Sequence, residues 1–244
     1  MPRQNDGTEL IRKLTGIDLY RIPTGTIGDT TVGVGGAVKG NATVPVAAIT
    51  NFSVGEPAFI IGDGGFELIT AIGTPATTMP ITNQKIEFAQ SAGARFVEAV
   101  KVPLGKIESG GFNLNLNRSL TPIESAQDDS PIGYEEGVLE LSGGMGLLGF
   151  NPENLQLVAG VVESITGAGT SADPYQGSLG GNSQTSLSNF AFRVAFLRND
   201  GKTGHFDLLN ARINASGGVT IGKGGSKAFQ CGVTFTQLIM RYNT

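Results

Sequence analysis

Apolar and polar residues alternate along GFNLNLNR (111–118), where Phe112, Leu114 and Leu116 are separated by asparagines. Successive side chains of an extended chain point to opposite faces, so this period of two predicts a strand with one apolar and one polar face. A second strand is expected around 138–141. The polar face of the first strand consists of Asn113, Asn115 and Asn117.

The same alternation predicts a hairpin in the last quarter of the chain. Apolar residues alternate in 190–196, the turn sequence Asn-Asp-Gly follows at 199–201, and a return strand is expected at 205–213. The segment FQCGVTF (229–235) alternates in the same way. It predicts another strand, in which Cys231 is a small buried apolar residue.

Shorter apolar runs between turn residues fill part of the first half. AAITNF (47–52), PAFIIG (57–62) and FELITAIG (66–73) are each bounded by residues typical of turns. The stretch 84–100 is compatible with a strand, a loop and another strand. Strands that recur every 8–12 residues or so are typical of small sandwiches and barrels. We therefore expect a small β module over residues 44–97.

Two segments carry helix signals. In NPENLQLVAGVVE (151–163), Asn151 can cap the first turn, Pro152 suits the first helical position and Glu153 complements the helix dipole. Residues 7–15 are compatible with a short helix. The longer segment is the stronger prediction because its start signals agree with one another.

These elements together predict a mainly β fold with one flanking helix. Residues 1–43 include a Gly/Thr-rich stretch with little apolar periodicity and are expected to form an N-terminal arm. The small β module at 44–97 follows, and the larger β domain occupies 98–244. Polar connections at 121–137 and 166–186 are expected to be loops.

Composition favours a protein that buries part of its surface in an assembly. Only 16% of the 244 residues are charged, whereas typical globular domains have about 25%. Such a low charge content guards a free monomer poorly against association. The chain also has 37 glycines, which suit many short strands joined by tight turns.

Charge and cysteine content exclude several classes of function. The net charge is −4 and no Lys/Arg-rich run is present, which argues against a groove that grips phosphates. The single cysteine cannot form an intramolecular disulfide or a multi-cysteine metal site. No stretch approaches about 18 consecutive apolar residues, and the first residues are too polar for a secretory signal. We therefore expect synthesis in a cytoplasm and no membrane insertion.

Catalytic motifs are weak. GVGGAVKG (33–40) and GKGGSK (222–227) lack the spacing of a dinucleotide fingerprint or a P-loop, and we interpret both as turns. His205, the only histidine, follows a hairpin turn, where a solvated or packing role is usual, and no serine lies in a G-x-S-x-G elbow. The acidic pairs at 128–129 and 135–136 share one loop, and the chain has no tryptophan to form a sugar platform. We expect no enzyme activity, no cofactor and no metal.

The segment GFNLNLNRSLTPIESAQ (111–127) resembles the tail tube proteins of bacteriophages. In that family an alternating strand with a polar face ends in a basic residue and is followed by a segment of the form SLTPIE. A helix of the form ENLQLVAG comes later, as at 153–160, and the closing strand is similar to 233–235. The order of elements is similar over roughly residues 100–244, and the resemblance does not extend to residues 1–99.

This resemblance implies a β-sandwich or barrel of the tail-tube type, with a flanking helix, in subunits that form hexameric rings. The rings of that family stack into a hollow tube in the virion, and one sheet of every subunit joins a barrel around the lumen. DNA is ejected through the lumen without specific binding. The implied partners are other copies of the chain and the tape measure, initiator and terminator proteins, with or without a sheath. The module at 44–97 would be an insertion on the tube exterior.

The resemblance also suggests roles for polar residues. The three alternating asparagines would face the lumen, and an ordinary solvated sheet face is the other interpretation of the same pattern. The acidic residues of the 121–137 loop would lie at a contact between rings or in the lumen. These acidic residues are Asp128, Asp129, Glu135 and Glu136.

Other functions remain open at this point. A capsid decoration protein or a tail-completion protein of the neck or terminator type can be built from similar β modules. Injection systems derived from phages contain similar tubes. The third class is a virion-associated hydrolase, whose activity would depend on His205.

Overall fold

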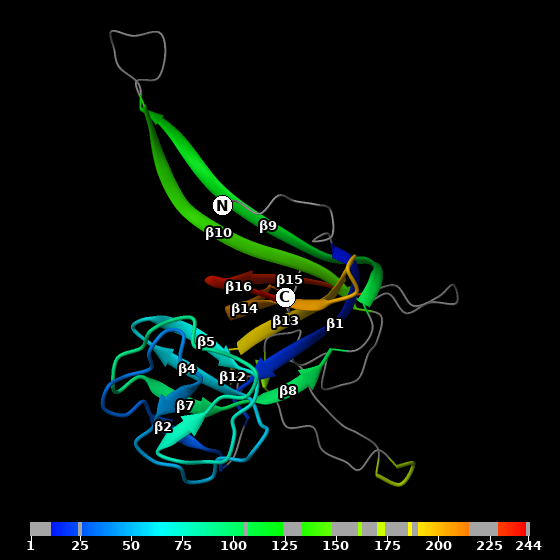
Figure 1. Ribbon diagram of the computed structural model, residues 1–244. Coiled ribbons are helices and arrows are strands. Elements are labelled where there is room, and N and C mark those ends of the chain that lie inside the picture. Colours follow the sequence, from blue (N-terminus) through cyan, green and yellow to red (C-terminus); the bar gives the residue numbers. More distant parts are fainter. Residues whose placement is uncertain are drawn as a thin grey trace.

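The computed structural model in Figure 1 is mainly β, with antiparallel sheets and no helix among the residues that it describes. The mainly β prediction is therefore confirmed for this part of the chain. None of the described residues belongs to a helix long and apolar enough to cross a membrane. The described residues are 11–23, 26–104, 107–123, 133–147, 161–162, 170–173, 185–186, 190–214 and 229–242.

The largest sheet has eight strands. They are β1 (Ile11–Arg21), β8 (Val100–Pro103), β9 (Ile107–Ile123), β10 (Gly133–Leu147), β13 (Phe190–Arg198), β14 (Thr203–Asn214), β15 (Phe229–Phe235) and β16 (Gln237–Tyr242). Their order is β8-β1-β13-β14-β15-β10-β9, and β16 also pairs with β14. We call β8, β1, β13, β14 and β16 the platform sheet, and β15, β10 and β9 the hairpin sheet. The hairpin predicted over 190–213 and the strand predicted over 229–235 are both confirmed.

The two sheets separate at a break between β15 and β16. Both strands pair with β14, β15 near its end and β16 nearer its start. At the break Asn210 has a φ of 48°, a left-handed conformation that asparagine tolerates better than most residues. Its side-chain amide donates a hydrogen bond of 3.2 Å to the Thr236 hydroxyl, and the Thr236 N–H donates to the Leu209 carbonyl. These two hydrogen bonds connect β14 to the residue between β15 and β16.

A core fills the space between the platform sheet and the hairpin sheet. Phe190, Phe192 and Val194 of β13 and Leu208 of β14 are buried in it, together with Met145 of β10. Alternation along β13 directs these residues to one face, as the sequence predicts. We call this the inner face of the platform sheet.

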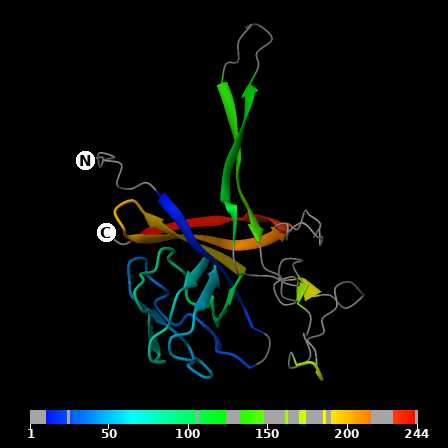
Figure 2. The same ribbon diagram turned by 90° about the vertical axis from the view of Figure 1, so that its right-hand side faces the viewer.

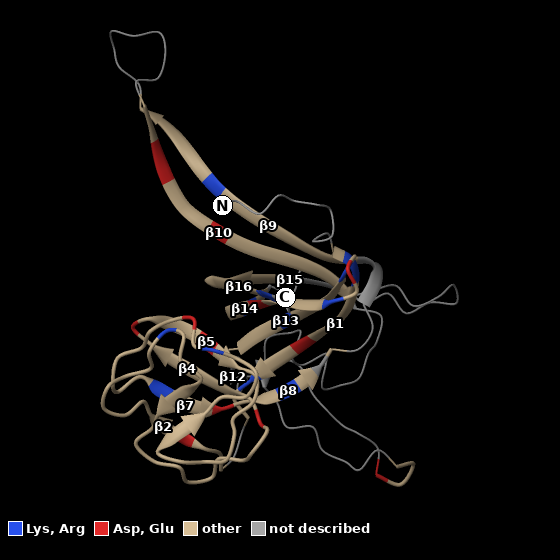
Figure 3. Cartoon of the chain, viewed as in Figure 1, with Lys and Arg blue, Asp and Glu red and all other residues tan. Residues whose placement is uncertain are grey.

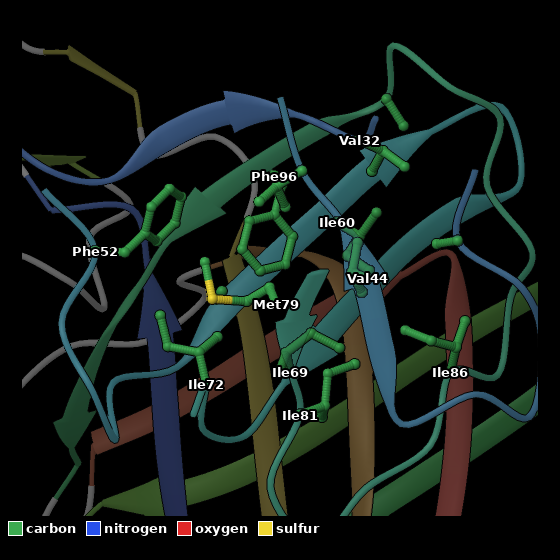
Figure 4. Packing of buried hydrophobic residues seen from close by; sticks show 14 residues of the cluster. Val32, Val44, Phe52, Ile60, Ile69, Ile72, Met79, Ile81, Ile86 and Phe96 are labelled. Atoms are coloured by element: carbon green, nitrogen blue, oxygen red, sulfur yellow. The ribbon is translucent and has the colours of Figure 1, made fainter. Parts of the chain in front are cut away.

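Residues 26–99 form a small β module with its own core (Figure 4). A four-stranded sheet has the order β2-β7-β4-β5, and β3 pairs with β6. Phe96, Ile60, Ile69 and Met79 are completely buried between these sheets. The bounds are β2 (Asp29–Thr31), β3 (Thr43–Pro45), β4 (Ala58–Gly62), β5 (Gly65–Ile69), β6 (Thr78–Pro80) and β7 (Arg95–Glu98).

Predictions within the module are partly confirmed. The runs at 57–62 and 66–73 overlap β4 and β5, and β7 is the second strand expected in 84–100. The first strand expected there is wrong, because residues 84–94 contain no strand. The strand predicted at 47–52 is wrong, because Asn51 has a φ of 64° and Ile49 is exposed. The segment is a turn, since its apolar residues do not alternate between a buried and an exposed face.

The module is inserted between two strands that are neighbours in the platform sheet. Arg21, at the end of β1, pairs with Val100, at the start of β8. The chain thus leaves the platform sheet at one point and returns beside it. The segment expected as an N-terminal arm, 1–43, contributes β1 to the platform sheet and β2 to the module.

The helix prediction for 7–15 is wrong where the structure describes the segment, because residues 11–15 belong to β1. This strand pairs with β13 along its length, and Ile17 and Leu19 enter the core. Two register shifts in β1 interrupt the period of two, which explains why the strand is hard to recognise. Of the helix predicted at 151–163, residues 151–160 and Glu163 lie outside the described residues. The remaining two residues form strand β11 (Val161–Val162), which pairs with β12 (Thr185–Ser186).

Candidate assembly surface

Strands β9 and β10 form a long hairpin whose outer part projects away from the rest of the molecule (Figures 1 and 2). β9 has 17 residues and β10 has 15, whereas the strands of the platform sheet have four to twelve. Residues 112–116 pair with 145–141, near the core, and residues 118–123 pair with 139–133, farther out. We call residues 116–123 and 133–140 the hairpin arm.

The base of the hairpin is held by the core. Phe112 and Leu114 of β9 and Leu141 of β10 pack against the buried residues of the platform sheet. A Cβ atom on Gly143 would lie 2.5 Å from the ring of Phe112. Glycine at this position therefore lets the aromatic ring lie across the neighbouring strand.

The apolar face of the base continues along the hairpin arm, where its side chains are exposed. Leu116 and Leu120 lie on the same face of β9 as Phe112 and Leu114, because their positions differ by multiples of two. Leu116 is 60% exposed and Leu120 is 59% exposed. On β10 the same face carries further exposed residues. The exposed apolar residues of this face are Leu116, Leu120, Tyr134 and Leu139. The ion pair between Arg118 and Glu136 lies on the same face, because Arg118 pairs with Leu139 and Glu136 pairs with Leu120.

Strand β10 has a β-bulge within the arm, at which two of its residues lie opposite one residue of β9. Ser119 faces both Gly137 and Val138, since the pairing shifts between Glu136 and Leu139. A Cβ atom on Gly137 would lie 2.1 Å from the Ser119 hydroxyl oxygen, so the bulge requires glycine there. Val138 is expelled into solvent and is 86% exposed.

The three asparagines singled out in the sequence lie together on the opposite face of the hairpin and are exposed. Across the strand pair, Ser142 faces Asn115 and Glu140 faces Asn117. The hairpin therefore has a polar face with the asparagines and a mainly apolar face, which the Arg118–Glu136 ion pair interrupts. A position in a lumen stays a prediction for Asn113, Asn115 and Asn117.

Both ends of the predicted 121–137 loop belong to strands. Residues 121–123 belong to β9 and residues 133–137 to β10, so Glu135 and Glu136 are strand residues. Glu136 forms an exposed ion pair with Arg118 across the hairpin. Figure 3 shows how few charged residues the arm carries. Asp128 and Asp129 lie outside the described residues.

A second cluster, of buried apolar and charged residues, joins the small β module to the outer face of the platform sheet. We call this contact the seam. Its apolar part includes Tyr20, Leu209 and Ile239 from the platform sheet and Phe66 and Leu68 from the module, all buried. It is a continuous core, so the module and the platform sheet are packed together.

Two buried acids and two arginines cross the seam. The Arg193 guanidinium donates two hydrogen bonds, of 2.6 and 2.8 Å, to the Asp207 carboxylate. Arg241 donates to Asp207 at 2.8 Å and to Glu67 of the module at 3.2 Å. Arg193 also donates to the Thr70 hydroxyl of the module. Asp207 and Glu67 are completely buried, and burial raises the pKa of Glu67.

His205 lies beside this network and is partly buried. Its Nε2 atom is 3.6 Å from an Asp207 oxygen and has no hydrogen-bond partner among the described residues. Burial lowers the pKa of His205 to about 4, and the charges of Arg193 and Arg241 act in the same direction, while Asp207 opposes them. The imidazole is therefore neutral at pH 7. No described hydroxyl or thiol donates a hydrogen bond to Nε2, so we interpret His205 as a packing residue.

Sequence reasoning missed the residues that make both surfaces distinctive. The arm's apolar face extends beyond Leu116 to Leu120, Tyr134 and Leu139, and a longer count of alternating positions in β9 would have included Leu120. No local signal could have paired Glu67 with Arg241, because 174 positions separate them in the chain.

No described residues form a group of three or more His, Cys, Asp or Glu side chains suited to hold a metal ion. A scan against protein-family models finds no match for this chain, and a search of curated proteins finds no significant similarity. The functional argument therefore rests on the geometry of the hairpin arm.

Proposed function

We propose that this chain is a structural virion protein whose copies assemble into stacked hexameric rings, forming the hollow tail tube through which a phage ejects DNA. The single observation that carries the proposal is the amphipathic hairpin arm. It projects from the body with its apolar face exposed and its polar face carrying the asparagines. Exposed apolar surface of this extent costs solubility unless a partner covers it.

The proposal accounts for both faces of the hairpin. A wall around a water-filled lumen needs polar side chains on one side and packed apolar side chains on the other. Few basic residues lie on the described arm, where Arg118 is bound to Glu136. A surface of this charge offers little attraction to the phosphates of passing DNA.

A tail-completion protein or a tube of a phage-derived injection system would use the same arm, and the module at 26–99 would lie on the exterior in each case. A capsid decoration protein differs because it needs a capsid to assemble on. We propose a structural function over a catalytic one because the environment of His205 is that of a packing residue.

Electron microscopy of the purified chain at rising concentration and near-neutral pH tests this proposal. We expect six-membered rings or hollow tubes of uniform diameter. A chain that remains monomeric at every concentration, in images and by light scattering, would overturn the proposal.

A further inference from the structure

Arg21, the last residue of β1, has a partly buried side chain without a partner among the described residues. Its Nε and Nη1 atoms are buried and have no hydrogen-bond partner. The residue as a whole is partly exposed, and its third guanidinium nitrogen, Nη2, is not among the buried atoms without a partner. A buried N–H group without an acceptor costs free energy of folding, because it has given up its hydrogen bond to water. The chain alone therefore leaves this charged group unsatisfied.

The strand register places Arg21 at the border of the core between the platform sheet and the hairpin sheet. Ile17 and Leu19 of β1 are buried in that core, and Arg21 follows them at the same spacing of two. Val100, which pairs with Arg21, packs against the same core. The side chains of these neighbours are apolar, so they offer the guanidinium no acceptor.

The other arginines that are buried or partly buried in the described part of the chain each have a carboxylate partner. These pairs are Arg95–Asp29, Arg193–Asp207, Arg198–Asp200 and Arg241–Asp207. A guanidinium can donate two parallel hydrogen bonds to one carboxylate, which makes arginine well suited to ion pairs away from water. Arg21 is the exception in this set, since it has the same chemistry and no carboxylate.

Carboxylates without an ion-pair partner are present on the surface. Glu56 of the module and Glu135 and Glu140 of the hairpin arm are exposed, and none of them forms an ion pair with another described residue. Within one copy no acceptor reaches Nε or Nη1 of Arg21. A second copy brings further carboxylates of this kind to every contact between copies.

We propose that Arg21 binds a carboxylate of a second copy when the copies assemble. This inference rests on the proposed function and assigns one residue to the contact between copies. The carboxylate approaches the guanidinium from its exposed side, at Nη2. Since Nε and Nη1 have no acceptor in the free chain, no internal hydrogen bond has to be broken when the new pair forms. The contact therefore satisfies donors that folding leaves unsatisfied.

The variant Arg21→Met separates this role from a role in folding. Methionine places an apolar side chain beside apolar neighbours, so the melting temperature of the isolated chain, measured by circular dichroism, should stay the same or rise. The protein concentration needed for assembly, measured by size-exclusion chromatography with light scattering, should rise roughly tenfold or more, as expected when a desolvated ion pair is broken. Arg21→Lys keeps the charge but loses the planar fork, so its effect on assembly should be intermediate.

Arg95→Met is the matched control. Arg95 is also partly buried, but its carboxylate partner Asp29 belongs to the same module. This variant should assemble at the same concentration as the unchanged chain. Equal weakening of assembly by Arg95→Met and Arg21→Met would indicate a general effect of lost positive charge and would overturn the inference.

The remaining outcomes distinguish this inference from the proposed function. A lower melting temperature of Arg21→Met would show that Arg21 has an acceptor within its own chain, which would overturn the inference. Assembly of Arg21→Met at an unchanged concentration would overturn it as well, whereas the tube proposal would stand. An unchanged chain that never assembles would overturn the proposed function and this inference with it.

Discussion

The seam and the hairpin arm both combine apolar and charged residues. They differ in how far these residues are buried and in how many hydrogen bonds the charged ones form. At the seam Arg193, Asp207, Arg241 and Glu67 are joined by hydrogen bonds and lie in a buried core. On the arm the apolar residues are exposed and a single ion pair lies in solvent. The comparison separates a surface that the folded chain covers with its own residues from one that it leaves exposed.

The largest expected effect comes from removing the shared acid of the seam. Asp207→Asn leaves Arg193 and Arg241 buried or nearly so without their common counter-charge, and we expect a loss of about 3–5 kcal/mol in the free energy of unfolding. Urea unfolding followed by circular dichroism measures it. The matched control, Glu136→Gln, breaks the exposed pair with Arg118 and should cost about 0–1 kcal/mol. Equal losses for the two variants would contradict the distinction between seam and arm.

A smaller effect separates the base of the hairpin from the arm. Phe112→Ala removes a ring that packs on the core, and we expect a loss of about 3 kcal/mol. Leu120→Ala lies on the same face of the same strand but is exposed, so the monomer should lose less than about 0.5 kcal/mol. Denaturation at low protein concentration gives both values. Under the proposed function, Leu120→Ala should also raise the protein concentration needed for rings, although it barely changes the stability of the monomer.

The smallest expected effect is a pH dependence of the seam. The unfolded chain protonates His205 near pH 6.5, whereas the folded chain does so at about 4, so the unfolded state binds more protons between these values. Stability should therefore fall as the pH falls through this window. The raised pKa of Glu67 acts in the opposite direction above pH 4.5 or so and reduces the net loss. Arg193, Arg241 and Asp207 of the platform sheet adjoin the imidazole, and Lys85 and Glu87 of the module line the cleft beside it.

The pH prediction is checked by urea unfolding at several pH values between 7 and 4. His205→Gln should flatten the profile. Because the chain has one histidine, its ring resonances in an NMR titration report this group alone. A midpoint near 6.5 in the folded protein would show that burial does not control the protonation of His205.

Alternation in the sequence predicted those strands whose period is unbroken and whose partners are close in the chain. The 190–213 hairpin and the two faces of 111–118 belong to this group. It did not predict β1, because two register shifts disturb the period and the partner strand β13 lies in the last quarter of the chain. Over residues 11–15, that pairing overrides the local helix signals of the 7–15 segment.

The candidate site was predictable only in part for a physical reason. The alternation of apolar residues in a strand is the same whether those residues pack in a core or are exposed to solvent. Leu114 and Leu116 therefore look alike in the alternation, although Leu114 packs on the core and Leu116 is exposed. The seam was not predictable at all, since it depends on side chains that meet only after the module has packed on the platform sheet.

The position of β1 has a consequence for the protein during its synthesis. This strand leaves the ribosome before the other described strands, yet it lies in the interior of the platform sheet, between β8 and β13. It can pair with β8 once the module has emerged and folded, but its other edge must wait for Phe190–Arg198. At about 5–20 residues per second, this wait lasts roughly ten seconds or more. Throughout that time Ile17 and Leu19 remain uncovered on the nascent chain, so binding by a chaperone during translation should raise the yield of folded protein.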